Sequence, residues 1–117
     1  MHYMMLFAEP RGQRLERTPD EGRAVYAEMV AFAEGLAGKG ILSSVESLQP
    51  ESSAVRLEVR NGVRRTLDGP FSESKEMIGG FMVVDCATME EALDLAAQCP
   101  AARWATVEVR PCGPCFM

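Results

Sequence analysis

The chain has 117 residues, of which 47% are hydrophobic and 25% charged; this suits one globular domain and excludes disordered and fibrous classes. The formal net charge of -5 disfavours a nucleic-acid partner, because phosphate binding requires clustered Lys and Arg side chains. The one dense basic run, Arg60, Arg64 and Arg65, is interpreted as a solvated strand end and turn.

The first predicted element is a strand over residues 2–8 with apolar side chains on both faces. Tyr3, Met5 and Phe7 alternate with His2, Met4 and Leu6. This pattern is typical of a central strand that is covered on both sides. Glu9 and Pro10 end the apolar run well short of a signal peptide, and no other stretch approaches the roughly 20 apolar residues of a membrane helix. We therefore expect a cytoplasmic protein.

A helix is predicted next, because Thr18-Pro19-Asp20-Glu21 is a typical helix start. Thr18 can cap the helix, Pro19 suits its first turn, and Glu21 completes a capping box. The apolar stripe of this helix is Val25, Met29, Phe32, Ala33 and Leu36. Gly38 or Gly40 is expected to end the helix, since glycine accepts the left-handed conformation.

The middle of the chain predicts a strand followed by a hairpin. Residues 41–48 form a plausible second strand, and residues 54–60 alternate between apolar and polar side chains. Asn61-Gly62 suits a two-residue turn, so residues 63–68 are expected to pair back antiparallel. The hairpin leads into a charged loop, residues 68–76.

The last part of the chain repeats the strand and helix pattern. Residues 79–85 are a hydrophobic strand, and Thr88-Met89-Glu90-Glu91 starts a helix that runs to about Cys99, before Pro100. Residues 105–110 alternate as the final strand. We expect residues 111–117 to form a flexible tail.

This order of elements predicts a single α+β domain over residues 1–117. The plan is a ferredoxin-like antiparallel sheet with two helices on one face and an added hairpin. No third helix is available to cover the second face of the sheet. A second copy of the chain is the simplest cover, so we expect a homodimer.

The loop Asp68–Glu76 has two interpretations, and both stay open. In the first it is a rigid, self-bonded turn, in which Asp68 accepts backbone bonds and Ser72 caps a short turn of helix. In the second, Asp68, Glu73 and Lys75 surround the mouth of a cleft. A carboxylate would then accept a proton, while the ammonium group holds an anionic substrate.

The same loop, together with Gly79-Gly80-Phe81 and the segment Val107–Pro111, resembles the DGPF-domain proteins of the YCII-related family. The resemblance extends from Tyr3-Met4 to Pro111 and implies a dimeric α+β barrel. The wider superfamily includes enzymes that isomerise or dehydrochlorinate small ring or muconate-like compounds. One branch of the family is found beside sigma-factor genes.

We therefore predict that the protein binds or transforms a small anionic or enolic molecule in a barrel cleft, by isomerase- or lyase-like acid–base chemistry. Asp68 and Lys75 are the predicted catalytic residues, with Asp68 as the acid–base group. Arg110, Glu73 and Ser72 are the predicted substrate-binding residues, and Arg110 would clamp a carboxylate. The alternative is a non-catalytic regulatory module that binds a protein such as a sigma factor.

A His-Asp pair has been proposed as the site of YCII-like proteins, but the only histidine here is His2, at the start of the first strand. We interpret it as a surface residue. Cys112-Gly113-Pro114-Cys115 has the spacing of a redox motif, yet no helix can follow it to lower a thiol pKa. A zinc site would need Cys86 and Cys99 as well. We expect free thiols, no metal and no cofactor.

Overall fold

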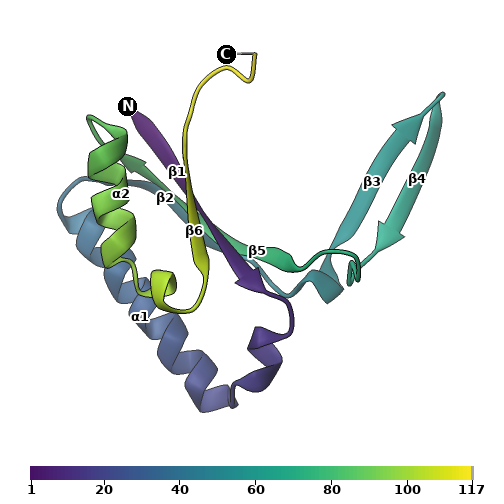
Figure 1. Cartoon of the computed structure of the whole chain (residues 1–117), viewed down its shortest axis with the longest axis horizontal. Helices are drawn as coiled ribbons and strands as arrows, with labels where there is room; N and C mark the ends of the chain where they lie inside the picture. The colour runs from purple at the N-terminus through teal and green to yellow at the C-terminus, as the bar shows by residue number, and fades with distance from the viewer. Residues whose placement is uncertain (117) are drawn as a thin grey trace.

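The computed structural model describes residues 1–116, which form a four-stranded antiparallel sheet, two α-helices and a separate two-stranded hairpin (Figure 1). The strands are β1 (His2–Pro10), β2 (Leu42–Ser47), β3 (Val55–Arg60), β4 (Val63–Asp68), β5 (Glu76–Asp85) and β6 (Thr106–Pro111). The α-helices are α1 (Pro19–Gly38) and α2 (Met89–Gln98), and short 3-10 helices span Gln13–Glu16, Glu51–Ser53 and Pro100–Arg103. No helix among these residues is long and apolar enough to cross a membrane.

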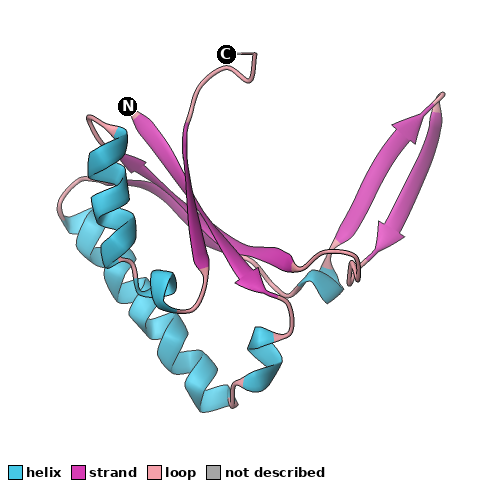
Figure 2. Ribbon diagram, in the orientation of Figure 1, coloured by secondary structure: helices cyan, strands magenta, loops and turns pink. Residues whose placement is uncertain are grey.

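The sheet has the strand order β2-β5-β1-β6, and β1 pairs antiparallel with both β5 and β6. Both helices lie on one side of it (Figure 2). The predicted ferredoxin-like plan is therefore confirmed, as is the central position of the first strand. That strand is longer than predicted, because its pairing with β5 continues through Glu9 and Pro10.

The two faces of the sheet differ in burial. Tyr3, Met5 and Phe7 point toward the helices and are at most 6% exposed. They pack with Met82 and Val84 of β5 and with Leu36 of α1. The opposite face of the same strands, called the open face below, carries Met4, Leu6, Phe81 and Val83, which are half-buried with no helix over them.

Helix α1 has the predicted start and end. Thr18 Oγ1 accepts a hydrogen bond from the Glu21 backbone N–H, and the Glu21 side chain accepts one from the Thr18 backbone N–H. The helix ends at Gly38, and Gly40 follows in the left-handed conformation at φ 72°. Of the predicted stripe, Ala33 and Leu36 are buried, whereas Val25 near the start of the helix is only half-buried.

The capping box predicts a pH-dependent contribution to stability. The bonds from Thr18 hold the pKa of Glu21 below its ordinary value. This contribution is therefore present above the unfolded-state pKa and is lost as pH falls through the folded-state pKa. We expect Glu21→Gln to lower the urea midpoint at neutral pH and to match the wild type in acid. Glu90→Gln, in the first turn of α2, is the control, and an equal pH-dependent effect there would contradict the prediction.

Strands β3 and β4 form the predicted hairpin, here called the arm (residues 55–68). Asn61 and Gly62 have φ values of 52° and 75°, as a turn of type I′ requires. The arm extends away from the four-stranded sheet, on the side opposite the helices (Figure 1). Every residue from Val55 to Asp68 is exposed.

The C-terminal segment begins with residues that still bond to β1. Pro111 still pairs with Tyr3, and the Cys112 backbone N–H donates to the His2 carbonyl at 2.9 Å. Pro111 is thus the last residue of β6, and a flexible tail over residues 111–117 stays a prediction. Its last residue, Met117, lies outside the described part of the chain.

Candidate functional site

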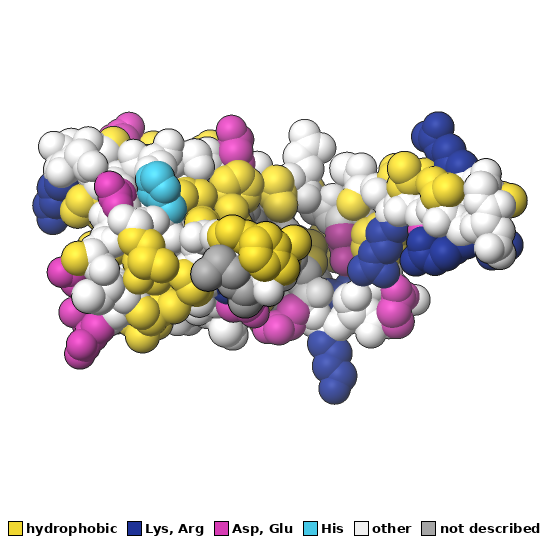
Figure 3. Space-filling view, turned by 90° about the horizontal axis from the view of Figure 1, so that it is seen from above, with side chains coloured by type: hydrophobic (Ala, Val, Ile, Leu, Met, Phe, Trp, Pro, Cys, Tyr) yellow, Lys and Arg dark blue, Asp and Glu magenta, His cyan; other side chains and the backbone are white. Residues whose placement is uncertain are grey.

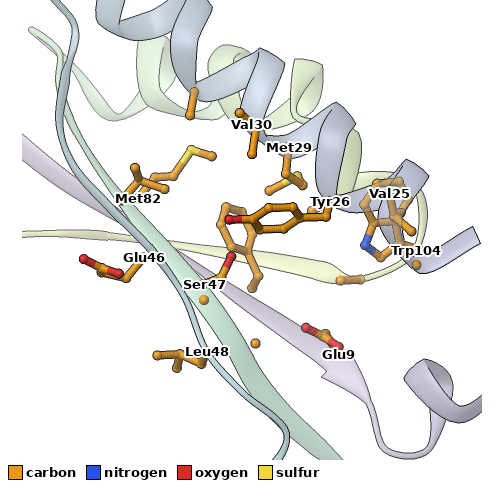
Figure 4. A pocket seen from close by; sticks show the side chains of 18 of the residues that line it. Glu9, Val25, Tyr26, Met29, Val30, Glu46, Ser47, Leu48, Met82 and Trp104 are labelled. Carbon is orange, nitrogen blue, oxygen red and sulfur yellow. The ribbon is translucent and has the colours of Figure 1, made fainter. Parts of the chain in front are cut away.

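A cavity with a volume of about 610 Å³ lies between α1 and the sheet. This volume is within the usual range for small-molecule sites. Its walls are mainly apolar: Phe7 and Met82 come from the sheet, Val25, Tyr26, Met29 and Val30 from α1, and Trp104 from the segment before β6 (Figure 4). The predicted core stripe of α1 therefore lines a cavity in its first half and packs into the core in its second half.

Aromatic side chains contribute to the lining of the cavity. Tyr26 projects from α1 across it in Figure 4, and Trp104 stands near the start of the helix. Gln13 Nε2 donates to the Trp104 carbonyl oxygen at 2.7 Å, which fixes this segment against the end of β1. Planar rings in the wall of a cavity suit a flat ligand.

A buried ion pair lies at one end of the cavity. Glu9 follows Tyr3, Met5 and Phe7 in the alternation of β1, so its carboxylate points to the helix side and the residue is only 8% exposed. Arg14 Nε donates to Glu9 Oε1 at 2.9 Å, and Arg14 Nη2 donates to Glu9 Oε2 at 2.8 Å. This bidentate geometry is the strong form of a carboxylate–guanidinium pair.

Backbone carbonyls hold the guanidinium of Arg14 from the other side. Nη1 donates to the Leu48 carbonyl oxygen at 2.8 Å, and Nη2 donates to the Gly79 carbonyl oxygen at 3.3 Å. The pair therefore joins β1, the 3-10 helix Gln13–Glu16, the end of β2 and β5. A guanidinium with this many fixed partners is held in one orientation at the cavity wall.

Gly79 and Gly80 make room for this arrangement. A Cβ atom at Gly79 would lie 1.5 Å from Glu9 Oε2 and 2.7 Å from Arg14 Nη2. At Gly80 it would lie 2.7 Å from the Glu46 carbonyl oxygen. The register of β1 and β5 shifts between Leu6 and Ala8, beside these glycines. Gly79 is therefore explained by the Glu9 carboxylate that it accommodates, and Gly80 by the close approach of the Glu46 backbone.

Arg17 supplies a second cation at the cavity. Its guanidinium lies 5.6 Å from the centre of the Trp104 ring, and it forms no ion pair within residues 1–116. Arg103 lies over the same ring at 5.4 Å, but it is bound to Glu28 at 2.7 Å. Arg17 is therefore the guanidinium of the cavity that is available to bind an anion.

The charged loop between β4 and β5 leads from the arm back to the four-stranded sheet. Asp68 is exposed at the end of β4, opposite Val55. Glu73 accepts a hydrogen bond from Arg56 Nη1 at 2.7 Å, and a bond from its own backbone N–H together with this contact lowers its pKa. Ser72 and Lys75 are exposed.

The predicted short turn of helix after Ser72 is wrong. The structure has a reverse turn there, closed by a hydrogen bond from the Ser74 N–H to the Phe71 carbonyl oxygen at 3.1 Å. Phe71, which begins this turn, is buried and only 6% exposed.

Arg110 lies on β6 opposite Met4, on the open face of the sheet. The cavity lining, taken over the described residues, includes none of the five predicted site residues Asp68, Ser72, Glu73, Lys75 and Arg110. His2 is exposed opposite Asp85, whose carboxylate binds the N-terminal ammonium at 2.9 Å. That bond and the ammonium charge lower the pKa of Asp85.

The four cysteines are free thiols that differ in burial. Cys86 and Cys99 are buried, which raises their pKa values, whereas Cys112 and Cys115 are exposed. No group of three or more His, Cys, Asp or Glu side chains within residues 1–116 is arranged to hold a metal ion.

Sequence reasoning did not select Glu9, Arg14, Arg17, Tyr26 or Trp104. The sequence did contain one signal for Glu9. It follows Tyr3, Met5 and Phe7 at the same spacing of two residues, so it places a carboxylate on the buried face of β1. A charged side chain on a buried face requires a partner of opposite charge, and Arg14 is close in sequence. The cavity itself has no sequence signal, because an apolar helix stripe looks alike over a core and over a pocket.

Comparison with known proteins gives a family, a relative and a structural neighbour. The family described as "YCII-related domain" matches residues 1–114. An uncharacterised protein of Rhizobium meliloti (strain 1021) is 36% identical over 94 residues, which are 79% of this chain and 76% of that protein.

The structural neighbour is 5-chloro-2-hydroxyhydroquinone dehydrochlorinase from Burkholderia phenoliruptrix AC1100, solved in complex with 2,5-dihydroxybenzoquinone. It superposes with a TM-score of 0.54 and 17% identity, over 97% of this chain and 94% of that chain. At this identity the similarity shows a shared fold.

Proposed function

This chain belongs to the YCII-related domain family, and on that premise we propose that its cavity binds a small anionic or enolic molecule and transforms it by acid–base chemistry. The reaction would be an isomerisation or an elimination. The observation that carries the proposal is the Glu9–Arg14 pair at the wall of an apolar cavity. Apolar walls with a few convergent polar groups are the usual composition of a ligand site.

The three charged groups divide the chemistry between them. The carboxylate of Glu9 accepts a proton from an enolic or phenolic hydroxyl group. The fixed guanidinium of Arg14 stabilises the oxyanion that this transfer creates, since it is already oriented and needs no reorganisation. Arg17 binds a second anionic oxygen at the edge of the Trp104 ring. In an isomerisation, protonated Glu9 returns the proton to a ring carbon. In an elimination, it returns the proton to the ring carbon that carries the leaving group, a second hydroxyl group of the substrate then gives up its proton, and the electrons of that O–H bond expel the leaving group as an anion. The net loss is one proton and one leaving-group anion.

The structural neighbour supports this class of substrate. It is a dehydrochlorinase of a hydroquinone, and its bound molecule is a dihydroxybenzoquinone. Such a flat ring with hydroxyl groups matches a cavity with aromatic walls and two guanidinium groups. The support comes from the shared fold and the cavity together.

Binding of 2,5-dihydroxybenzoquinone, measured by titration calorimetry, tests the proposal. Because Arg17 would bind a ligand oxygen as a charged donor, Arg17→Met is expected to weaken binding by about tenfold or more. Arg23→Met is the matched control, since Arg23 is paired with Asp20 on the exposed side of α1. Binding that is unchanged in Arg17→Met would contradict the role of this cavity.

The same measurement separates the cavity from the charged loop. Acid–base roles for Asp68 and Lys75, and binding roles for Ser72, Glu73 and Arg110, remain predictions. If the cavity is the site, Asp68→Asn and Lys75→Ala leave binding and turnover unchanged, whereas Glu9→Gln abolishes turnover of any lactone, muconate or halogenated hydroquinone found by screening. The opposite pattern would assign the reaction to the loop.

A further inference from the structure

The segment Cys112–Cys115 contains a cysteine pair that lies outside the lining of the cavity. Both of its thiols are free and exposed, whereas Cys86 and Cys99 are buried. The chain bends at Gly113 and enters a turn at Cys115. A disulfide requires Cα atoms within about 7 Å of each other, and a fully extended chain carries residues three apart beyond that distance. A bend between the two cysteines is therefore the condition for closing a disulfide between them.

Three polar residues form a row across β5, β1 and β6 at one end of the sheet. His2 lies opposite Asp85 in the register of β1 and β5. Pro111 lies opposite Tyr3 in the register of β1 and β6, so Cys112 comes opposite His2, and its backbone N–H donates to the His2 carbonyl oxygen at 2.9 Å. Opposite residues of antiparallel strands carry their side chains on the same face, with Cβ atoms about 4.5–5.5 Å apart. Cys112, His2 and Asp85 are therefore successive members of one row.

The row is exposed in this structure, and its members are charged or polar. Figure 3 looks onto the end of the molecule where both termini lie and shows the one histidine side chain, coloured cyan, at the surface. Asp85 accepts a hydrogen bond from the N-terminal ammonium; this bond is the main cause that lowers its pKa, and the charge on His2 acts in the same direction. An ionised carboxylate beside an imidazole holds that ring in one orientation.

Cys112 thus has the neighbours that a nucleophilic thiol requires. A base must take the proton of the thiol, and a third group must orient the base. His2 and Asp85 supply these two roles, in that order along the row. Redox motifs with the spacing of Cys112 and Cys115 often rely on the N-terminus of a helix. Here an imidazole from the other end of the chain takes that place, because β1 pairs with β6.

We propose that Cys112 is a thiol that reacts with hydroperoxides, and that Cys115 converts the product into a reversible disulfide. In the first step His2 takes the thiol proton while the sulfur attacks one oxygen of the peroxide. The O–O bond breaks, and the second oxygen leaves with the proton that His2 returns. Hydrogen peroxide thus oxidises Cys112 to a sulfenic acid and is itself reduced to water.

The second step belongs to Cys115. Its sulfur attacks the sulfur of the Cys112 sulfenic acid, the S–O bond breaks, and the hydroxyl group leaves with the Cys115 proton as water. The two steps together convert two thiols and one hydrogen peroxide into one disulfide and two molecules of water. A dithiol reductant such as dithiothreitol reopens the disulfide by exchange and is oxidised in its place. This oxidation site does not depend on what the cavity binds.

Hydrogen peroxide added to the reduced full chain tests the proposal. The chain is expected to lose two of its four thiols, and mass spectrometry of the C-terminal peptide is expected to show a disulfide between Cys112 and Cys115. Cys86 and Cys99 are the internal control, since burial keeps their thiols out of the reaction. Dithiothreitol is expected to restore all four thiols. In Cys115→Ser the reaction stops at the sulfenic acid of Cys112, which dimedone traps.

A matched pair of variants isolates the role of His2. Cys115→Ser keeps Cys112 as its exposed thiol, and Cys112→Ser keeps Cys115, which lies three residues beyond the row. Peroxide is expected to oxidise Cys112 about 100-fold faster than Cys115, the low end of the range for general acid–base catalysis. Adding His2→Asn to Cys115→Ser is expected to remove this advantage. Because His2 is exposed, this variant is expected to keep the fold.

Equal oxidation rates for the two thiols would overturn the proposal, and so would a rate for Cys112 that His2→Asn leaves unchanged. Oxidation that consumes Cys86 or Cys99 in place of the exposed pair would also overturn it. The same holds for disulfides that form only between chains.

Discussion

Replacing Arg14 by Met is expected to lower the free energy of unfolding by about 3 kcal/mol, the low end of the range for breaking a buried ion pair. The side chains of Arg14 and Glu9 are 29% and 11% exposed, so the carboxylate that remains has little access to water. The Leu48 and Gly79 carbonyl oxygens lose a donor at the same time. Urea denaturation followed by circular dichroism measures the change.

The double variant Glu9→Gln with Arg14→Met separates two contributions to the loss of stability: the loss of the ion pair and the burial of an unpaired Glu9 carboxylate. It is expected to be more stable than Arg14→Met alone, because a neutral amide costs less to bury than a carboxylate. Arg23→Met removes an exposed pair and is expected to change stability by less than about 0.5 kcal/mol. Equal losses in Arg14→Met and Arg23→Met would contradict the structural role of the buried pair.

Replacing Gly79 by Ala adds only one methyl group, but we expect it to lower the free energy of unfolding by about as much as Arg14→Met does. Its Cβ atom would stand 1.5 Å from Glu9 Oε2, so the carboxylate has to leave its place and release the guanidinium. We expect a loss of about 3 kcal/mol, as for breaking the pair directly. Ligand binding in the cavity is expected to fall with it, since Arg14 is no longer oriented.

Gly35→Ala is the matched control for this substitution. Gly35 lies within α1, and a Cβ atom there would meet nothing within 4 Å. Alanine is favoured over glycine inside a helix, so this variant is expected to gain about 0.5–1 kcal/mol. Adding Glu9→Ala to Gly79→Ala should recover part of the loss, because the colliding carboxylate is gone. If it recovers none, the collision is not the cause.

The composition of the charged loop Asp68–Glu76 did not distinguish between its two interpretations. Phe71 and Gly69 hold the root of the arm, and Glu73 pairs with Arg56 of β3. Within the loop the Ser74 N–H donates to the Phe71 carbonyl oxygen, and the interpretation of the loop as the mouth of a cleft stays a prediction. A loop of charged residues can satisfy itself or surround a substrate, and the local sequence is the same in both cases.

The local elements followed from the sequence alone. Periodicity placed β1, α1 and β6, the Thr18 capping box started α1 where predicted, and Asn61-Gly62 closed the hairpin between β3 and β4. These features depend on interactions between residues near each other in the chain, so a single sequence contains them. The order of elements then led to the ferredoxin-like sheet, and the charged loop with Gly79-Gly80-Phe81 indicated the family.

Tertiary structure alone decided where the cavity and the arm lie. Whether Val25 and Met29 pack into a core or line a pocket depends on how α1 lies relative to the sheet, and no residue of the stripe encodes that distance. The partnership of Glu9, Arg14 and Gly79 joins segments that are far apart in sequence. Such contacts form only when β1 and β5 pair in one register, so the physical reason is that register and packing are properties of the whole fold.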